Sequence, residues 1–189
     1  MPSPDTALVL IDVINPFTFD GAEDLLAHAG PAVDAIADLA RRAREAGVPV
    51  VYVNDHFGNW KESFDDLVER CATDDVPGRE IAQRLRPVDG DYHVLKPKHS
   101  GFFQTPLESL LAELGARRLV LAGFATDICV LATAMEASMR DFDLVVPQDA
   151  GAAETAAAHE AALVHARRVL HAETPPASAV DFGVPAEVA

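Results

Sequence analysis

Residues 117–137, RRLVLAGFATDICVLATAMEA, decide the fold class of this chain. Residues 118–122 form a short apolar run typical of a buried strand, and Gly123 then permits a sharp turn. Apolar and small residues from 128 to 139 follow helical spacing. This order predicts a buried strand that turns directly into a helix.

Cys129 falls near the N-terminus of that predicted helix, where Thr126 and Asp127 offer N-cap side chains. Unpaired backbone N–H groups and the positive end of the helix dipole lie at such a terminus, and both favour a thiolate. The thiolate is the reactive form of cysteine, and the same N–H groups can stabilise an oxyanion. A lone cysteine in an apolar helix is also a common small core residue, so that alternative stays open at this point.

The alternation of strand and helix continues along the rest of the chain. Strands are predicted at 7–12, 48–55, 92–97, 118–123 and 143–149, and further helices at 31–46, 61–71, 78–85, 106–115 and 153–171. Pro31 is expected in the first turn of its helix, after an irregular segment at 15–26. We therefore predict one α/β domain over residues 1–189, with three α-β-α layers and a mostly parallel, Rossmann-like sheet of five or six strands.

Composition limits the partners of the protein. The 189 residues include 30 acidic and 15 basic side chains, a formal charge of −15 that repels nucleic acid and anionic membranes. We expect neither as a partner. No apolar run approaches the ~20 residues of a membrane span, and MPSPDTALVLID at the N-terminus does not resemble a secretory signal. With only two cysteines and no disulfide framework, the expected location is the cytoplasm.

Polar residues stand at the ends of the predicted strands. Asp12, Asp55 and Lys96 close the first three, and Cys129 follows the fourth. The carboxyl ends of parallel strands share one edge of the sheet, so we expect these side chains to meet there. Alone, Asp12 is commonly a turn former and Lys96 commonly a surface residue. Together they predict a nucleophile with an acid–base pair: Asp12 acts as the general base, and Lys96 holds it ionised. The implied reaction is acyl transfer from a C–N bond through a thioester.

Three motifs resemble the isochorismatase-like cysteine hydrolases, which include nicotinamidases, N-carbamoylsarcosine and ureidoacrylate amidohydrolases, and isochorismatases. They are ALVLID with Asp12, K-x-x-x-S-G-F with Lys96, and GFATDICVLATAMEA with Cys129. The resemblance covers most of the chain and implies that these three residues form a catalytic triad. It also implies a non-proline cis peptide at Phe124–Ala125 and an oxyanion hole formed by the backbone amides of Ala125 and Cys129.

The chain departs from the nicotinamidase branch of that family at its metal site. That branch binds a metal through an Asp-x-His pair after the second strand and a further His before a Cys. Asp55 matches, but Phe57 stands two residues later and Arg70 stands before Cys71. One carboxylate with His56 out of position is a poor site for a divalent ion. We therefore expect no catalytic metal, no cofactor and no nicotinamidase activity.

These observations predict a metal-independent cysteine hydrolase that cleaves a C–N bond of a small amide, ureido or carbamoyl substrate. The alternatives are isochorismatase-type vinyl-ether hydrolysis, a catalytically silent metabolite-binding protein, and a redox-sensing thiol. Cys71 is interpreted as structural. The Ala-rich face of 152–166 could pack against a second subunit, and the resemblance implies an oligomer because members of that family are commonly oligomeric. We therefore expect a homo-oligomer, either a dimer or a tetramer. Candidate substrate contacts are Asn15, Phe17, Asn54, Trp60, Phe102 and Thr126.

Overall fold

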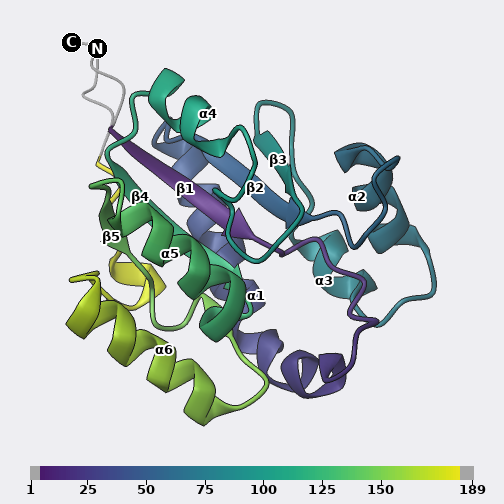
Figure 1. Ribbon diagram of the computed structural model, residues 1–189. Helices are drawn as coiled ribbons and strands as arrows, with labels where there is room; N and C mark the ends of the chain where they lie inside the picture. Colours follow the sequence, from purple (N-terminus) through teal and green to yellow (C-terminus); the bar gives the residue numbers. More distant parts are fainter. Residues whose placement is uncertain (1–4, 184–189) are drawn as a thin grey trace.

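The computed structural model describes residues 5–183, which form a six-stranded sheet between two layers of helices (Figure 1). The sheet order is β3-β2-β1-β4-β5, with β6 beside the end of β4, and every pairing is parallel. The predicted α/β class and mostly parallel sheet are therefore confirmed. The strands are β1 (Thr6–Ile11), β2 (Val50–Asp55), β3 (Tyr92–Lys96), β4 (Arg118–Phe124), β5 (Asp143–Val145) and β6 (Gly151–Ala152).

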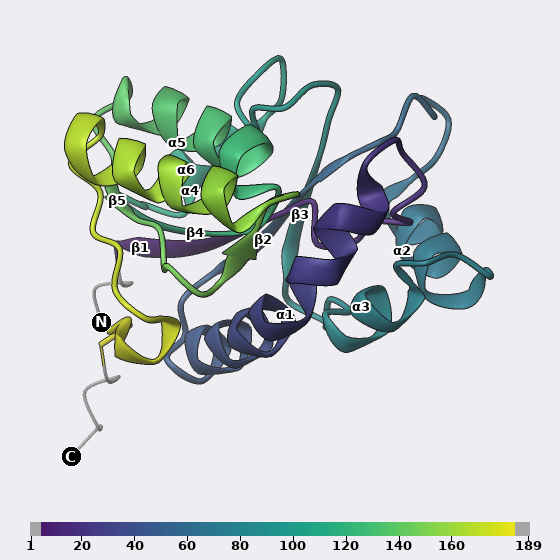
Figure 2. The same ribbon diagram turned by 90° about the horizontal axis from the view of Figure 1, so that it is seen from below.

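Helices cover both faces of the sheet. Figure 2 shows α4, α5 and α6 on one face and α1 with α3 on the other. None of the helices within residues 5–183 is long and apolar enough to cross a membrane. The helices are α1 (Ala22–Glu45), α2 (Phe64–Thr73), α3 (Arg79–Arg84), α4 (Leu107–Glu113), α5 (Leu131–Ser138) and α6 (Ala156–Val169), and a short 3₁₀ turn follows at Ala177–Ala179.

Alternate residues of β1 serve two separate cores. Leu8 and Leu10 pack into the core beneath α1, whereas Ala7, Val9 and Ile11 pack into the core beneath α4, α5 and α6. All five side chains are completely buried. A strand buried on both faces needs apolar residues at every position, which explains the uninterrupted run ALVLI.

Helix α1 begins nine residues before the predicted start at Pro31, so the prediction of an irregular segment up to residue 26 is wrong in its second half. The extra turns bury Ala22, Leu25 and Ala29, and this packing outweighs the hydrogen bond that a proline inside a helix removes. Gly21 precedes the first turn at a φ of 84°, a conformation that glycine adopts readily.

The predicted strand at 143–149 is wrong in its second half, because β5 ends at Val145. The N–H of Val146 donates to the carbonyl of Glu173 instead, and Pro147 has no N–H to offer a neighbouring strand. The chain returns to the sheet only at β6, which was not predicted. The other predicted strands are present with their ends shifted by at most two residues.

The strand order reverses between β1 and β4. The chain moves from β1 outward to β2 and β3, and then crosses back to place β4 on the other side of β1. Ligands of parallel α/β sheets bind at the carboxyl ends of the strands beside such a reversal. Gly123 stays within β4, at a φ of 128°, rather than forming the predicted turn: a Cβ there would lie 2.0 Å from the carbonyl oxygen of Ile11. Glycine thus allows β4 to approach β1 closely at this edge.

Candidate active site

Asp12 directly follows β1, and both of its carboxylate oxygens are held. Its backbone has a φ of 51°, in the left-handed region that aspartate tolerates better than most residues. Oδ1 accepts a hydrogen bond of 2.7 Å from the N–H of Asp55, and Oδ2 lies 2.8 Å from Nζ of Lys96. The ends of β2 and β3 therefore fix this carboxylate.

Lys96 ends β3 and is completely buried. Its Nζ lies 2.8 Å from Oδ2 of Asp12, 3.8 Å from Oδ2 of Asp55 and 3.6 Å from Sγ of Cys129. Burial opposes the charge of this ammonium, but Asp12, followed by Cys129 and Asp55, outweighs burial and raises the pKa of Lys96. The ammonium of Lys96 thus lies close to two carboxylates and one thiol.

Cys129 lies in a turn of π-helix, Thr126–Val130, that joins β4 to α5. The peptide bond Phe124–Ala125 before this turn is cis, as the family resemblance predicts. The carbonyl of Ala125 accepts a hydrogen bond of 3.2 Å from the N–H of Val130, the five-residue spacing that defines a π-helix. The turn brings the thiol to the carboxyl ends of the strands, beside Lys96.

The prediction that Thr126 and Asp127 cap this helix is wrong. The cap position is Ala125, and no side chain caps the turn. The hydroxyl of Thr126 instead forms a hydrogen bond of 2.9 Å with Nδ1 of His159 in α6. A backbone carbonyl closes the turn, which leaves the threonine free to bind the neighbouring helix.

Thr133 connects the cysteine turn to the loop after β3. Its hydroxyl donates to the carbonyl of Cys129 at 2.7 Å and accepts from the N–H of Gly101 at 3.0 Å. This buried bridge holds the turn against the loop that continues from Lys96.

The ionisation of Cys129 differs from the sequence-based expectation. Burial, followed by the Asp12 carboxylate, raises the pKa of this thiol, although Lys96 acts in the opposite direction. Burial also raises the pKa of Asp12 in spite of Lys96. The raised pKa runs against the prediction that the turn favours a thiolate, and the thiol lies beside a carboxylate that can take its proton. Cys71 is fully buried, and burial raises its pKa to about 11, in agreement with a structural role.

A cavity of about 400 Å³ opens at this edge, with Asp12 and Cys129 in its wall. We call it the strand-end cavity. Nδ1 of His99, also in the wall, lies 3.8 Å from Sγ of Cys129. Much of the remaining wall is apolar and consists of Phe19, Leu25, Phe57, Phe124 and Ile128.

Only part of the predicted substrate contacts line this cavity. Asn15 does, and its Oδ1 accepts a hydrogen bond of 2.8 Å from the N–H of Phe17. Phe17 is buried and does not line the cavity, but its ring lies edge-on to that of Phe124, which does. Phe102 is buried in the core on the α5 side of the sheet, and Trp60 is 78% exposed. Neither of the last two lines the cavity.

Asn54 and Thr126 support the site from outside the cavity. Asn54 is completely buried, and its Nδ2 donates to the carbonyl of Ile14 at 2.7 Å. This bond holds the segment after β1 against the end of β2. Thr126 is buried and binds His159, as described above. Asn54 thus fixes the backbone after β1, and Thr126 ties the cysteine turn to α6.

Other cavity residues were not predicted from the sequence. Phe57 and Ile128 are among them, and each lies within two residues of Asp55 or Cys129. Their closeness in sequence to the site residues was the signal that could have identified them as cavity residues. Glu154, which also lines the cavity, precedes α6 and carries no comparable signal.

The residues at the position of the nicotinamidase metal site do not fit a metal. Phe57 forms part of the cavity wall, and Nε of Arg70 pairs with Glu62 at 2.6 Å. Within residues 5–183, no three His, Cys, Asp or Glu side chains come together in a group that could hold a metal ion. The absence of a catalytic metal stays a prediction.

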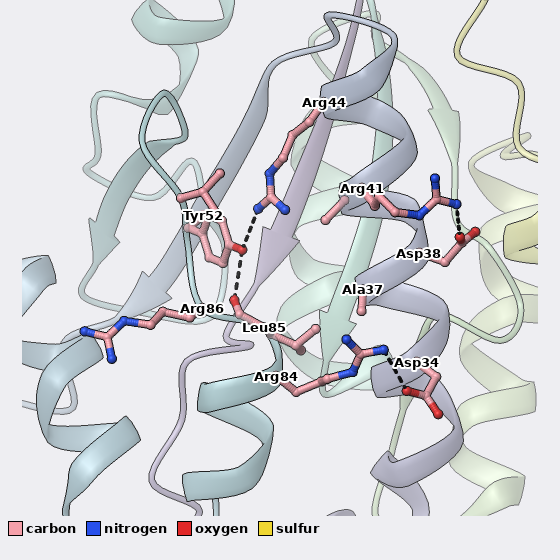
Figure 3. A pocket seen from close by; sticks show the side chains of 11 residues that line it. Asp34, Ala37, Asp38, Arg41, Arg44, Tyr52, Arg84, Leu85 and Arg86 are labelled. Atoms are coloured by element: carbon pink, nitrogen blue, oxygen red, sulfur yellow. Dashed lines mark hydrogen bonds and ion pairs between the residues drawn. The ribbon is translucent and has the colours of Figure 1, made fainter.

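A second cavity, of about 350 Å³, lies between α1, the end of α3 and Tyr52 of β2 (Figure 3). We call it the arginine-lined cavity, after Arg41, Arg44, Arg84 and Arg86 in its wall. Each arginine has a carboxylate partner, and Figure 3 shows Arg44 directed toward the hydroxyl of Tyr52. This cavity contains neither a cysteine nor a strand-end carboxylate.

Comparison with known proteins agrees with the geometry. The family model described as the isochorismatase domain matches residues 6–175. The uncharacterized isochorismatase family protein YaaI of Bacillus subtilis is 38% identical over 173 residues, which are 92% of this chain and 94% of YaaI. Ureidoacrylate amidohydrolase RutB of Methylorubrum extorquens is 30% identical and matches over 77% of this chain and 68% of RutB.

A solved structure gives the same result. The crystal structure of N-carbamoylsarcosine amidase from Thermoplasma acidophilum superposes with a TM-score of 0.71 at 29% identity, over 93% of this chain and 98% of that one. The family model, the sequence relatives and the fold thus agree with the three motifs at the strand ends. The chain belongs to the isochorismatase family.

Proposed function

We propose that this protein is a cysteine hydrolase that cleaves a C–N bond of a small amide, ureido or carbamoyl compound. The observation that carries the proposal is the cluster of Lys96, Asp12 and Cys129 at the strand-end cavity. It places a thiol beside a carboxylate whose raised pKa suits it to exchange a proton. The relatives named as a ureidoacrylate amidohydrolase and an N-carbamoylsarcosine amidase support this reaction class.

The first half of the reaction forms a thioester. As Sγ of Cys129 attacks the carbonyl carbon, its proton passes to Asp12. The tetrahedral oxyanion is held by the backbone N–H groups of Ala125 and Cys129, both in the cavity wall. When the C–N bond breaks, Asp12 returns the proton to the leaving nitrogen, and ammonia or an amine departs.

The second half hydrolyses the thioester. Asp12, again ionised, takes a proton from water while the hydroxide attacks the acyl carbon. The C–S bond then breaks, and the proton on Asp12 returns to the sulfur. Lys96 stays charged throughout and stabilises whichever of Asp12 and Cys129 is ionised at each step.

Cys129→Ala tests the proposal, with ammonia release from a panel of small amides as the readout. We expect turnover to fall by at least ~10³-fold, because the nucleophile is lost. Cys71→Ala is the matched control. It removes the second cysteine, which lies outside the cavity, and we expect this variant to retain activity. Hydroxylamine should capture the acyl group as a hydroxamate from the wild type only.

Three outcomes would contradict the proposal. Turnover that survives in Cys129→Ala would favour vinyl-ether hydrolysis. Binding of a compound that the wild type leaves chemically unchanged would favour a silent metabolite-binding protein. Activity lost on chelation and restored by a divalent ion would contradict the metal-independent mechanism.

A further inference from the structure

The strand-end cavity carries an excess of negative charge. Asp12, Asp20, Asp55 and Glu154 all line it. Among residues 5–183, no lysine or arginine belongs to its wall. Lys96 lies buried behind the wall, with its Nζ shared by Asp12, Asp55 and Cys129. The ammonium of Lys96 is therefore already used by the catalytic groups.

Asp20 and Glu154 add charge that the catalytic groups do not require. Neither forms an ion pair with another side chain in the part of the chain that the structure describes. Glu154 lies against Gly21, where a Cβ would stand 2.8 Å from its Oε1. Glycine at residue 21 thus leaves room for the glutamate beside the start of α1. Both carboxylates are exposed at the cavity and can contact a ligand there.

The rest of the wall suits an apolar group. Three phenylalanines, Phe19, Phe57 and Phe124, line the cavity together with Leu25 and Ile128. The volume of about 400 Å³ accommodates a small molecule. The wall thus combines a large apolar area with carboxylates. Among residues 5–183, its only basic side chain is the imidazole of His99, and it has no lysine or arginine to pair with an acidic ligand.

We infer that the substrate carries no carboxylate, and that a positive charge on an otherwise apolar body favours its binding. This inference rests on the proposed function, because it names the class of amide that the same cavity takes. An anionic ligand would meet Asp20, Asp55 and Glu154 without a free cation to oppose them, and like charges repel strongly in a partly enclosed site. The inferred substrate therefore differs from ureidoacrylate, a carboxylate, for which one relative of this chain is named.

Charged thiol reagents test the inference without any substrate. Aminoethyl, methyl and sulfonatoethyl methanethiosulfonate carry a positive, no and a negative charge. Each forms a mixed disulfide with the Cys129 thiolate and releases methanesulfinate. Rates are measured in a Cys71→Ala background and divided by the rates for free cysteine. We expect the cationic reagent to react with Cys129 at least tenfold faster than the anionic one, with a ratio that narrows as salt is added.

Two variants show whether the named carboxylates cause the selectivity. Asp20→Asn combined with Glu154→Gln should reduce the ratio at least threefold. Asp89→Asn combined with Glu113→Gln is the matched control: it makes the same two chemical changes at exposed residues that line neither the strand-end cavity nor the arginine-lined cavity. The control should leave the ratio unchanged. A wild-type ratio near one, or an equal effect of both double variants, would overturn the inference.

Amide turnover separates this inference from the proposed function. Matched amides with an ammonium, a neutral or a carboxylate group at the far end are supplied to the wild type and to Cys129→Ala. Cys129-dependent hydrolysis that favours the carboxylate amide would overturn the inference and leave the proposed function intact. If no amide is hydrolysed, the proposed function fails, and the reagent ratio still decides whether the cavity selects cations.

Discussion

The strand-end cavity and the arginine-lined cavity are similar in size, about 400 and 350 Å³, and both have several charged side chains in their walls. In the arginine-lined cavity each cation has its own carboxylate, such as Asp91 for Arg44 and Asp34 for Arg84. Behind the wall of the strand-end cavity, the buried ammonium of Lys96 is shared by two carboxylates and a thiol. An arginine with a carboxylate of its own contributes to the stability of the fold. A lysine shared by several acidic groups leaves some of those groups able to exchange a proton.

Removing the shared cation should have the largest effect. Lys96→Met keeps the length of the side chain but leaves Asp12, Asp55 and Cys129 without positive charge. We expect amide turnover to fall by about 10³-fold or more, because Asp12 then holds its proton and no longer serves as a base. The kcat of ammonia release measures this. A variant within tenfold of the wild type would remove Lys96 from the mechanism.

Removing a cation with its own partner should change stability instead. Arg44→Met leaves the nearly buried carboxylate of Asp91 with its bond from the N–H of Val88 but without its ion pair. We expect the free energy of unfolding to fall by about 1–3 kcal/mol. Denaturant unfolding measures the loss, and the kcat of the folded variant should match that of the wild type. A large loss of kcat would mean that the two cavities are coupled.

Asp12→Asn should change thiol reactivity and turnover in opposite directions. The carboxylate raises the pKa of Cys129, so its removal lowers that pKa and increases the thiolate fraction at pH 7. We expect alkylation of Cys129 by iodoacetamide at pH 7 to become about tenfold faster, while amide turnover is lost with the base. Peptide mass spectrometry follows the alkylation, with Cys71 as the internal control. Slower alkylation in the variant would show that Asp12 promotes the thiolate.

The smallest effect is expected at the exposed pair of the arginine-lined cavity. Arg84 and Asp34 are 3.4 Å apart and largely exposed, so Arg84→Met should change the free energy of unfolding by no more than about 0.5 kcal/mol. Parallel unfolding of Arg84→Met and Arg44→Met compares an exposed pair with a partly buried one. Equal losses would indicate that burial of Asp91 contributes little.

The sequence predicts the buried strands of the sheet better than it predicts where individual helices and strands begin and end. The runs that became β1, β2 and β4 were recognisable because strands buried on both faces must be apolar at nearly every position. The first turns of α1 were missed because Pro31 is a strong local signal, and only tertiary burial of Leu25 and its neighbours outweighs it. Pro147, in contrast, does end a strand.

The sequence likewise predicts the reactive residues of the candidate site but not the wall of its cavity. Asp12, Lys96 and Cys129 stand at strand ends, where topology alone brings distant residues together. The cavity wall was not predictable, because residues such as Glu154 lie on connections without periodicity. The raised pKa of Cys129 was also missed, since burial beside Asp12 depends on packing that local sequence does not reveal.

The central position of β1 also bears on how the chain is made. β1 pairs on one side with β2 and on the other with β4, whose paired residues lie more than 100 positions later in the chain. At translation rates of 5–20 residues per second, the β4 side of β1 stays without its partner for on the order of ten seconds. An apolar strand with a free edge readily pairs with other chains. Slow synthesis or a low supply of chaperones should therefore reduce the soluble yield of this protein before any property of its finished site is affected.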